Sequence, residues 1–215
     1  MVLNKCKRHA NQSTKSQFWR RAFIRSAFAL IEGTIHFQKV SAFSYHERNT
    51  RPMHDLFQAM GHESPVSIFA DTIPTNELAL LLDENTEITD KGTCRVKQAF
   101  PSMARNIKFT FHMLSRIFKI SDEPNYAADG WRLLREGIEI RNRITHPKAF
   151  EEFDIADAEI EIIGKGCQWF LDSMVAAMKA ITQTLREMEE KTLAWLHSLP
   201  PEEIQLVMHL TSRED

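Results

Sequence analysis

The stretch that most constrains this chain is a helix pattern over residues 131–145 that runs into His146 and Pro147. Apolar residues recur there at helical spacing on two adjoining faces, which is typical of a helix packed against a core. These residues are Leu133, Leu134, Ile138, Ile140 and Ile144. The ring of a proline pushes the preceding residue out of the α region. The sequence therefore predicts a helix of about residues 127–146 that ends near Thr145.

The end of this helix gathers groups that can bind a phosphate and transfer a proton. On an unbroken helix, Arg141 and His146 would point about 140° apart, at about 100° per residue. An extended residue at position 146 frees the imidazole to turn back toward Arg141 and Asn142. A guanidinium, an amide and a titratable ring are then expected to converge. The same residues also fit a basic helix C-terminus, where Arg and His offset the negative end of the helix dipole.

The segment Arg141–His146 has the sequence Arg-Asn-Arg-Ile-Thr-His. It resembles the signature of the HEPN superfamily, which is an Arg, a polar residue, three variable residues and a His. Members of that family are mostly helical bundles and are often metal-independent RNases. Residues 20–33 also look like the first helix of such domains. The resemblance implies catalytic roles for Arg141, Asn142 and His146, and a dimer with two motifs facing one cleft.

These residues suit a metal-independent endoribonuclease in which a ribose 2′-OH attacks the adjacent phosphodiester. An imidazole titrates close to neutral pH, so His146 can act as base or acid. Arg141 offers a fork of donors to a phosphate, and Asn142 can orient either partner. One His cannot readily carry out both proton transfers, so a homodimer with RNA as its substrate is expected. A noncatalytic helical module for binding or regulation is the alternative.

Three further cations are candidates for binding the phosphates of a substrate: Arg143, Lys148 and Arg25. On the first helix, Arg25 follows Arg20 and Arg21, and this edge fits a solvated face better than an RNA contact. Glu32 lies among apolar neighbours and is expected to be buried. It can orient an Arg or a His across the bundle, or serve as a satisfied structural carboxylate.

The composition of the whole chain limits the kinds of function that it can have. The formal net charge of its 215 residues is −2, so no overall basic footprint is present for clamping duplex nucleic acid, and an RNA site must be local. The three cysteines lie far apart and show no zinc or disulfide spacing, which favours a reducing, cytoplasmic compartment. We expect no metal, no cofactor and no membrane span. A toxin or defence role, with an antitoxin or regulatory protein as partner, fits the resemblance.

The expected fold is all-α, a HEPN-like helical bundle with a small β-hairpin insertion near residues 86–98. Residues 1–16 are polar and basic, and we interpret them as a mobile tail. Residues 17–198 form a single helical-bundle domain, and its longest helix covers about residues 157–198. Residues 199–215 start with prolines and acids, which predicts a C-terminal helix packed on the domain or on its dimer partner.

Two apolar stripes run along the helix pattern that begins at Phe18. One stripe contains Ile24, Phe28, Ile31 and Ile35, and the other contains Trp19, Phe23, Leu30 and Phe37. A helix that is apolar on two sides is expected to be central, with both faces buried. The turn residues of segment 44–74 predict an irregular connection after it.

Overall fold

The computed structural model describes residues 2–50, 73–121 and 123–205. These parts are mostly helical, with one two-stranded antiparallel sheet, which confirms an all-α fold with a small hairpin. Among the described residues, no helix is both long enough and apolar enough to cross a membrane. The HEPN-like topology stays a prediction.

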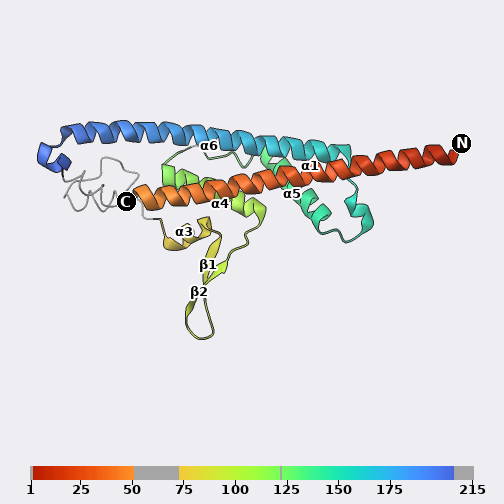
Figure 1. Cartoon of the computed structure of the whole chain (residues 1–215), viewed down its shortest axis with the longest axis horizontal. Helices are drawn as coiled ribbons and strands as arrows, with labels where there is room; N and C mark the ends of the chain where they lie inside the picture. The colour runs from red at the N-terminus through yellow and green to blue at the C-terminus, as the bar shows by residue number, and fades with distance from the viewer. Residues whose placement is uncertain (1, 51–72, 122, 206–215) are drawn as a thin grey trace. The chain divides into compact units, whose positions relative to one another are not determined.

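Helix α1 spans Val2–Tyr45 without a break and is followed by a π-helix, η1, at His46–Thr50. Figure 1 shows α1 in red to orange. The helix begins sixteen residues before the predicted start at Phe18, because Lys, Arg, Gln and Ala all have high helix propensities. The mobility of residues 1–16 stays a prediction. Most of the predicted irregular connection, residues 51–72, lies outside the described residues.

The predicted β-hairpin is confirmed. Helix α3 spans Thr75–Leu81, strand β1 spans Glu84–Ile88 and strand β2 spans Cys94–Gln98. The strands are antiparallel, with Thr86 opposite Val96. Gly92 turns the chain between them at a φ of +74°, in the left-handed region that glycine adopts most easily. Helix α4 then spans Met103–Phe118.

The helix that carries the motif ends where the sequence predicts, and the next long helix begins where the sequence predicts. Helix α5 spans Asp129–Thr145, and helix α6 spans Asp157–Ser198. A short 3-10 helix, η3, lies between them at Phe150–Phe153. Residues 201–205 are again helical, and the rest of the predicted C-terminal helix lies outside the described residues.

The chain divides into two compact units, each assembled from separate stretches of sequence. The first unit consists of the described residues of Met1–His36, Ser102–Ile107 and Pro124–Val175. The second unit consists of those of Phe37–Pro101, Lys108–Glu123 and Ala176–Asp215. The expectation of a single domain over residues 17–198 stays a prediction.

In the first unit, α1, α5 and α6 bury a shared core that contains Phe28, Leu134 and Phe170. Gly166 lets α6 approach α5 closely, because a Cβ there would lie 2.7 Å from the backbone of Leu134. Gly137 on α5 is packed too, with a Cβ position 3.3 Å from the Phe28 ring. The helix-weakening effect of Gly166 is therefore offset by packing.

In the second unit, polar side chains pair across the elements. Lys39 on α1 is buried and ion-paired with Asp83, which follows α3. Arg116 on α4 is ion-paired with Glu77 on α3. The Tyr45 ring packs on α4, and burial raises the pKa of its hydroxyl.

The second apolar stripe of α1 is exposed, so the prediction of burial on both faces is wrong. The stripe facing the core is buried, and Ile24, Phe28, Ile31 and Ile35 are at most 2% exposed. On the other stripe, Trp19 is 68% exposed, Phe23 45%, Leu30 57% and Phe37 66%. An apolar pattern shows which faces favour burial, but it does not show whether the chain supplies elements to cover them.

Candidate functional site

The end of α5 places His146 outside the helix, as the proline predicts. His146 has φ −130° and ψ 60°, and its backbone N–H still donates to the Asn142 carbonyl at 3.0 Å. The Thr145 hydroxyl donates to the Arg141 carbonyl at 2.7 Å, which further satisfies the last turn. The His146 side chain is exposed, and its imidazole makes no hydrogen bond or ion pair with any residue that the structure describes.

Arg141 is held by two neighbours. Its Nη2 lies 2.9 Å from Oε1 of Glu32 on α1, and its Nη1 donates to Oδ1 of Asn142 at 3.1 Å. Glu32 thus contacts an Arg across the bundle, which fits one of the two roles left open for it. Its expected burial is wrong, because its side chain is 49% exposed and that of Arg141 is 28% exposed. The pair thus lies at the surface, where solvent and a substrate can reach it.

Arg143 is used inside the protein. Its Nη1 lies 2.9 Å from Glu159 Oε1, and its Nη2 donates to the Asp154 carbonyl at 3.1 Å. Burial acts to raise the pKa of Glu159, but the hydrogen bonds from Arg143 and the Ala156 N–H, with the Arg143 charge, hold it below its ordinary value. The Nε of Arg143 is buried without a hydrogen-bond partner among the described residues. This side chain braces the start of α6, and its role in binding phosphate stays a prediction.

Lys148 and Arg25 remain exposed cations. The backbone N–H of Lys148 donates to Glu152 Oε2 at 2.7 Å, which fixes the chain just after the motif. Within the described residues, neither the Lys148 ammonium nor the Arg25 guanidinium makes a hydrogen bond or ion pair. Both are free to take a substrate phosphate, and that role stays a prediction.

Two arginines expected on a solvated face make structural contacts instead. Arg20 donates to the Ile155 carbonyl and is ion-paired with Asp157 at the start of α6. Arg21 donates to the Phe153 carbonyl at 3.2 Å. The expectation was wrong because these arginines satisfy carbonyls of the segment between α5 and α6, which has few backbone partners of its own. The acidic residues in the first turn of α6, Asp157 and Glu159, are the sequence signal that could have predicted a basic partner there.

The structure thus offers one candidate site: an exposed imidazole after the end of a helix whose last turns carry a paired guanidinium and amide. The convergence of the imidazole with this pair stays a prediction. Arg141 uses two of its donors in these contacts, and a guanidinium has five, so it can still bind a phosphate oxygen. Within the described parts of the chain, no three His, Cys, Asp or Glu side chains gather in a way that could hold a metal ion. The site is suited to acid–base chemistry on a charged substrate.

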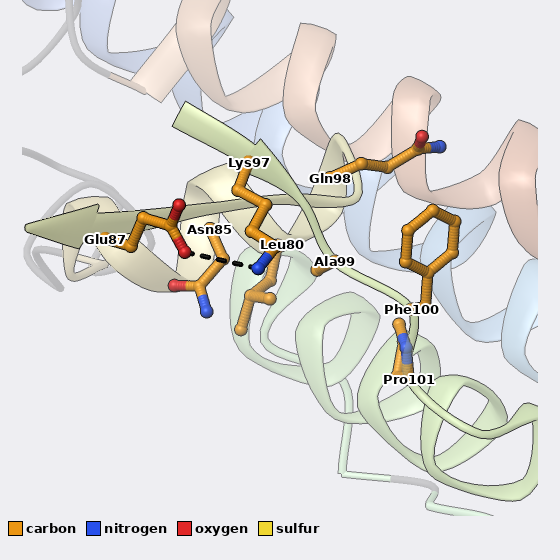
Figure 2. A pocket seen from close by; sticks show the side chains of 8 residues that line it. All are labelled: Leu80, Asn85, Glu87, Lys97, Gln98, Ala99, Phe100 and Pro101. Atoms are coloured by element: carbon orange, nitrogen blue, oxygen red, sulfur yellow. Dashed lines mark hydrogen bonds and ion pairs between the residues drawn. The ribbon is translucent and has the colours of Figure 1, made fainter. Parts of the chain in front are cut away.

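A hollow lies on the hairpin of the second unit. It suits acid–base chemistry on a charged substrate less well than the end of α5 does. Figure 2 shows Lys97 of β2 joined to Glu87 of β1, with Phe100 at one edge of the hollow. The Lys97 Nζ lies 3.2 Å from Glu87 Oε2, so its charge is already matched. No histidine lines this hollow. The end of α5 is therefore the better candidate.

When the chain is compared with family models, curated proteins and solved structures, it matches none of them. These comparisons neither support nor oppose the HEPN resemblance. The functional argument therefore rests on the residues of the site itself.

Proposed function

We propose that the chain is a metal-independent endoribonuclease with a HEPN-like site formed by Arg141, Asn142 and His146. The observation that carries this proposal is the break of α5 at Thr145. It leaves His146 exposed and outside the helix, directly after a last turn that holds the Arg141–Asn142 pair. A capped helix end requires no such pair of arginine and amide.

The reaction divides into three tasks. A base takes the proton of a ribose 2′-OH as its oxygen attacks the adjacent phosphorus, and the bond from phosphorus to the 5′ oxygen breaks. An acid gives a proton to that leaving oxygen, so the products are a 2′,3′-cyclic phosphate and a 5′-hydroxyl. Arg141 stabilises the charge that develops on the phosphoryl oxygens. His146 serves as base or acid, and Asn142 keeps the Arg141 guanidinium in place.

A second proton-transfer group completes this scheme. A second copy of the chain, with its His146 facing the first across a shared groove, would supply it, as the resemblance implies. Arg143, Lys148 and Arg25 are then proposed to guide the RNA strand toward the groove. A toxin or defence role, controlled by an antitoxin or regulatory protein, is consistent with such an activity.

The ion pairs at the site favour one alternative function. Glu32 neutralises Arg141 and Glu159 neutralises Arg143, so both motif arginines already have carboxylate partners. A noncatalytic helical module for binding or regulation would have the same contacts. It would not cleave RNA.

One experiment separates these functions. Purified protein is incubated with mixed cellular RNA in excess chelator, and the wild type is compared with His146→Ala. We expect cleavage by the wild type that leaves cyclic phosphate and 5′-hydroxyl ends, and a loss of about 100-fold or more in the variant. His197→Ala is the matched control, because His197 is an exposed histidine in the last turn of α6. Products with 5′-phosphates, or equal activity in His146→Ala, would refute the proposal.

A further inference from the structure

The exposed face of α1 carries a regular pattern of large and small residues. Large apolar side chains occur at Trp19, Phe23 and Leu30, and small residues occur between and after them at Ser26 and Gly33. We call these five residues the α1 seam. Their spacing alternates between four and three, which is the heptad spacing of helices that pack along their length. All five are exposed, and a Cβ at Gly33 would have no atom within 4 Å.

From residue 22 to residue 34, the residues beside the seam are small and uncharged. Ala22 and Ala29 border it on one side, and Ala27 and Thr34 border it on the other. In most paired helices these flanking positions carry charges that select a partner. Here only Arg20, beside Trp19, is charged, and it is ion-paired with Asp157, so another helix can approach residues 22–34 closely without ionic repulsion.

The order of large and small residues makes the seam complementary to itself in one direction. Two antiparallel copies that meet at the level of residue 28 place Phe23 opposite Gly33 and Leu30 opposite Ser26. Phe23 and Leu30 then each face a small side chain, as close packing requires, while Trp19 meets Phe37 of the other copy. A parallel pair would place Phe23 on Phe23 and Gly33 on Gly33, which leaves gaps at the small layers. The pattern therefore selects an antiparallel second copy over a parallel one.

The exposed apolar side chains of α1 offer the area of a small interface between two copies. Large aromatic side chains bury about 150–250 Å² each, so the exposed parts of Trp19, Phe23 and Leu30 amount to roughly 350 Å² per copy. Phe37 follows Leu30 at the same heptad spacing on α1 and is 66% exposed. Together these four side chains expose roughly 480 Å² per copy, which is less than the roughly 800 Å² that each partner buries in an interface of standard size and fits a weaker pair.

We propose that the chain forms a two-fold dimer in which the α1 seams of two copies pack antiparallel, centred near residue 28. A face that is complementary to itself serves both subunits at once, which is the arrangement that two-fold symmetry requires. This inference rests on the exposed face of α1 and does not depend on RNA cleavage. At about 100° per residue, Glu32 lies about 100° from Gly33 and about 160° from Leu30 around α1, so the Arg141–Glu32 pairs point away from this interface. This dimer is therefore distinct from one in which two His146 side chains face a shared groove.

The first test is the mass of the full chain in solution by sedimentation, without RNA. We expect a dimer for the wild type and a monomer for Leu30→Glu with unchanged helix content, because a charge would be buried opposite Ser26. Leu193→Glu is the matched control, since Leu193 is an exposed leucine of α6, and it should stay dimeric. A monomeric wild type, or a dimeric Leu30→Glu, would overturn the proposal, whatever the result of the RNA assay.

The second test determines the direction of the pair by disulfide trapping. In the antiparallel dimer, the two copies of residue 29 are offset by only about 3 Å along the helices, whereas the two copies of residue 22 are offset by about 18 Å. Ala29→Cys should therefore form a covalent dimer under mild oxidation, and Ala22→Cys should give no more than the unsubstituted chain. Equal trapping at both positions, or none at residue 29, would contradict the antiparallel arrangement.

Discussion

Two groups of charged side chains near the connection from α5 to α6 differ in how many protein contacts they make: the group around Glu159 at the start of α6, and Arg141 with His146 at the end of α5. At the start of α6, Arg143, Glu159 and Arg20 all bind protein groups. At the end of α5, His146 is exposed, and Arg141 makes one ion pair at the surface. Two arginines that are two residues apart on one helix thus have different surroundings. Position within a motif therefore does not determine a role, whereas the partners of a side chain restrict the roles that it can have.

Among the variants that test this difference, Arg141→Ala should have the largest effect, and the effect should be on RNA cleavage. Removal of a donor to a developing negative charge lowers the rate by about 100- to 1,000-fold, so we expect RNA cleavage to fall by that amount. Stability should change by less than about 1 kcal/mol, because the ion pair with Glu32 is exposed. Cleavage is followed on labelled single-stranded RNA, and thermal unfolding is measured beside it.

Arg132→Ala is the control for this variant, because Arg132 is an exposed arginine of α5 that pairs with Asp129 and Glu136. It should retain full activity. An Arg141→Ala protein that unfolds, rather than losing only its activity, would show that Arg141 acts as a helix cap.

Glu159→Gln should have the opposite profile, with a loss of stability and little loss of activity in the folded protein. The substitution removes the carboxylate that pairs with Arg143, a side chain that is partly buried. The expected loss is roughly 1–3 kcal/mol, measured by urea unfolding at neutral pH. Glu161→Gln, on the same helix but fully exposed, should leave the urea midpoint nearly unchanged.

The effect of Glu159 should also depend on pH. The pKa of Glu159 is lowered in the folded protein, so its contribution to stability is present above the unfolded pKa, about 4.3, and is lost as the pH falls through the folded value. The difference in stability between wild type and Glu159→Gln should therefore shrink below about pH 4. A constant difference down to acid pH would show that the carboxylate has no charged role.

Lys148→Ala should have the smallest effect. Its ammonium is exposed, and if it contacts one phosphate of a single strand, the slope of log affinity against log salt should fall by about 0.7. Fluorescence anisotropy with a short RNA, on a His146→Ala background that prevents cleavage, gives this slope. An unchanged slope would remove Lys148 from the RNA path and leave Arg25 as the next candidate.

The sequence predicted the parts of the fold that depend on local rules. Pro147 ended α5 at Thr145, and the Lys91-Gly92 turn formed the hairpin, because both effects act within a few residues. The sequence did not predict the surroundings of Trp19 and Leu30, which depend on which elements reach α1. The same limit applies to the site. A contact of Glu32 with an arginine was one of two roles left open, and the difference between Arg141 and Arg143 depends on where α6 begins.

The close approach of α6 to α5 at Gly166 limits which substitutions this chain can accept. Any side chain at position 166 would meet the backbone of Leu134, eleven residues before Thr145, and α5 would have to shift as a body. Gly164, two residues earlier, has no atom within 4 Å of its Cβ position and should accept alanine. Genetic variation should therefore be strongly restricted at residue 166, although Gly166 has no side chain to contribute to any reaction.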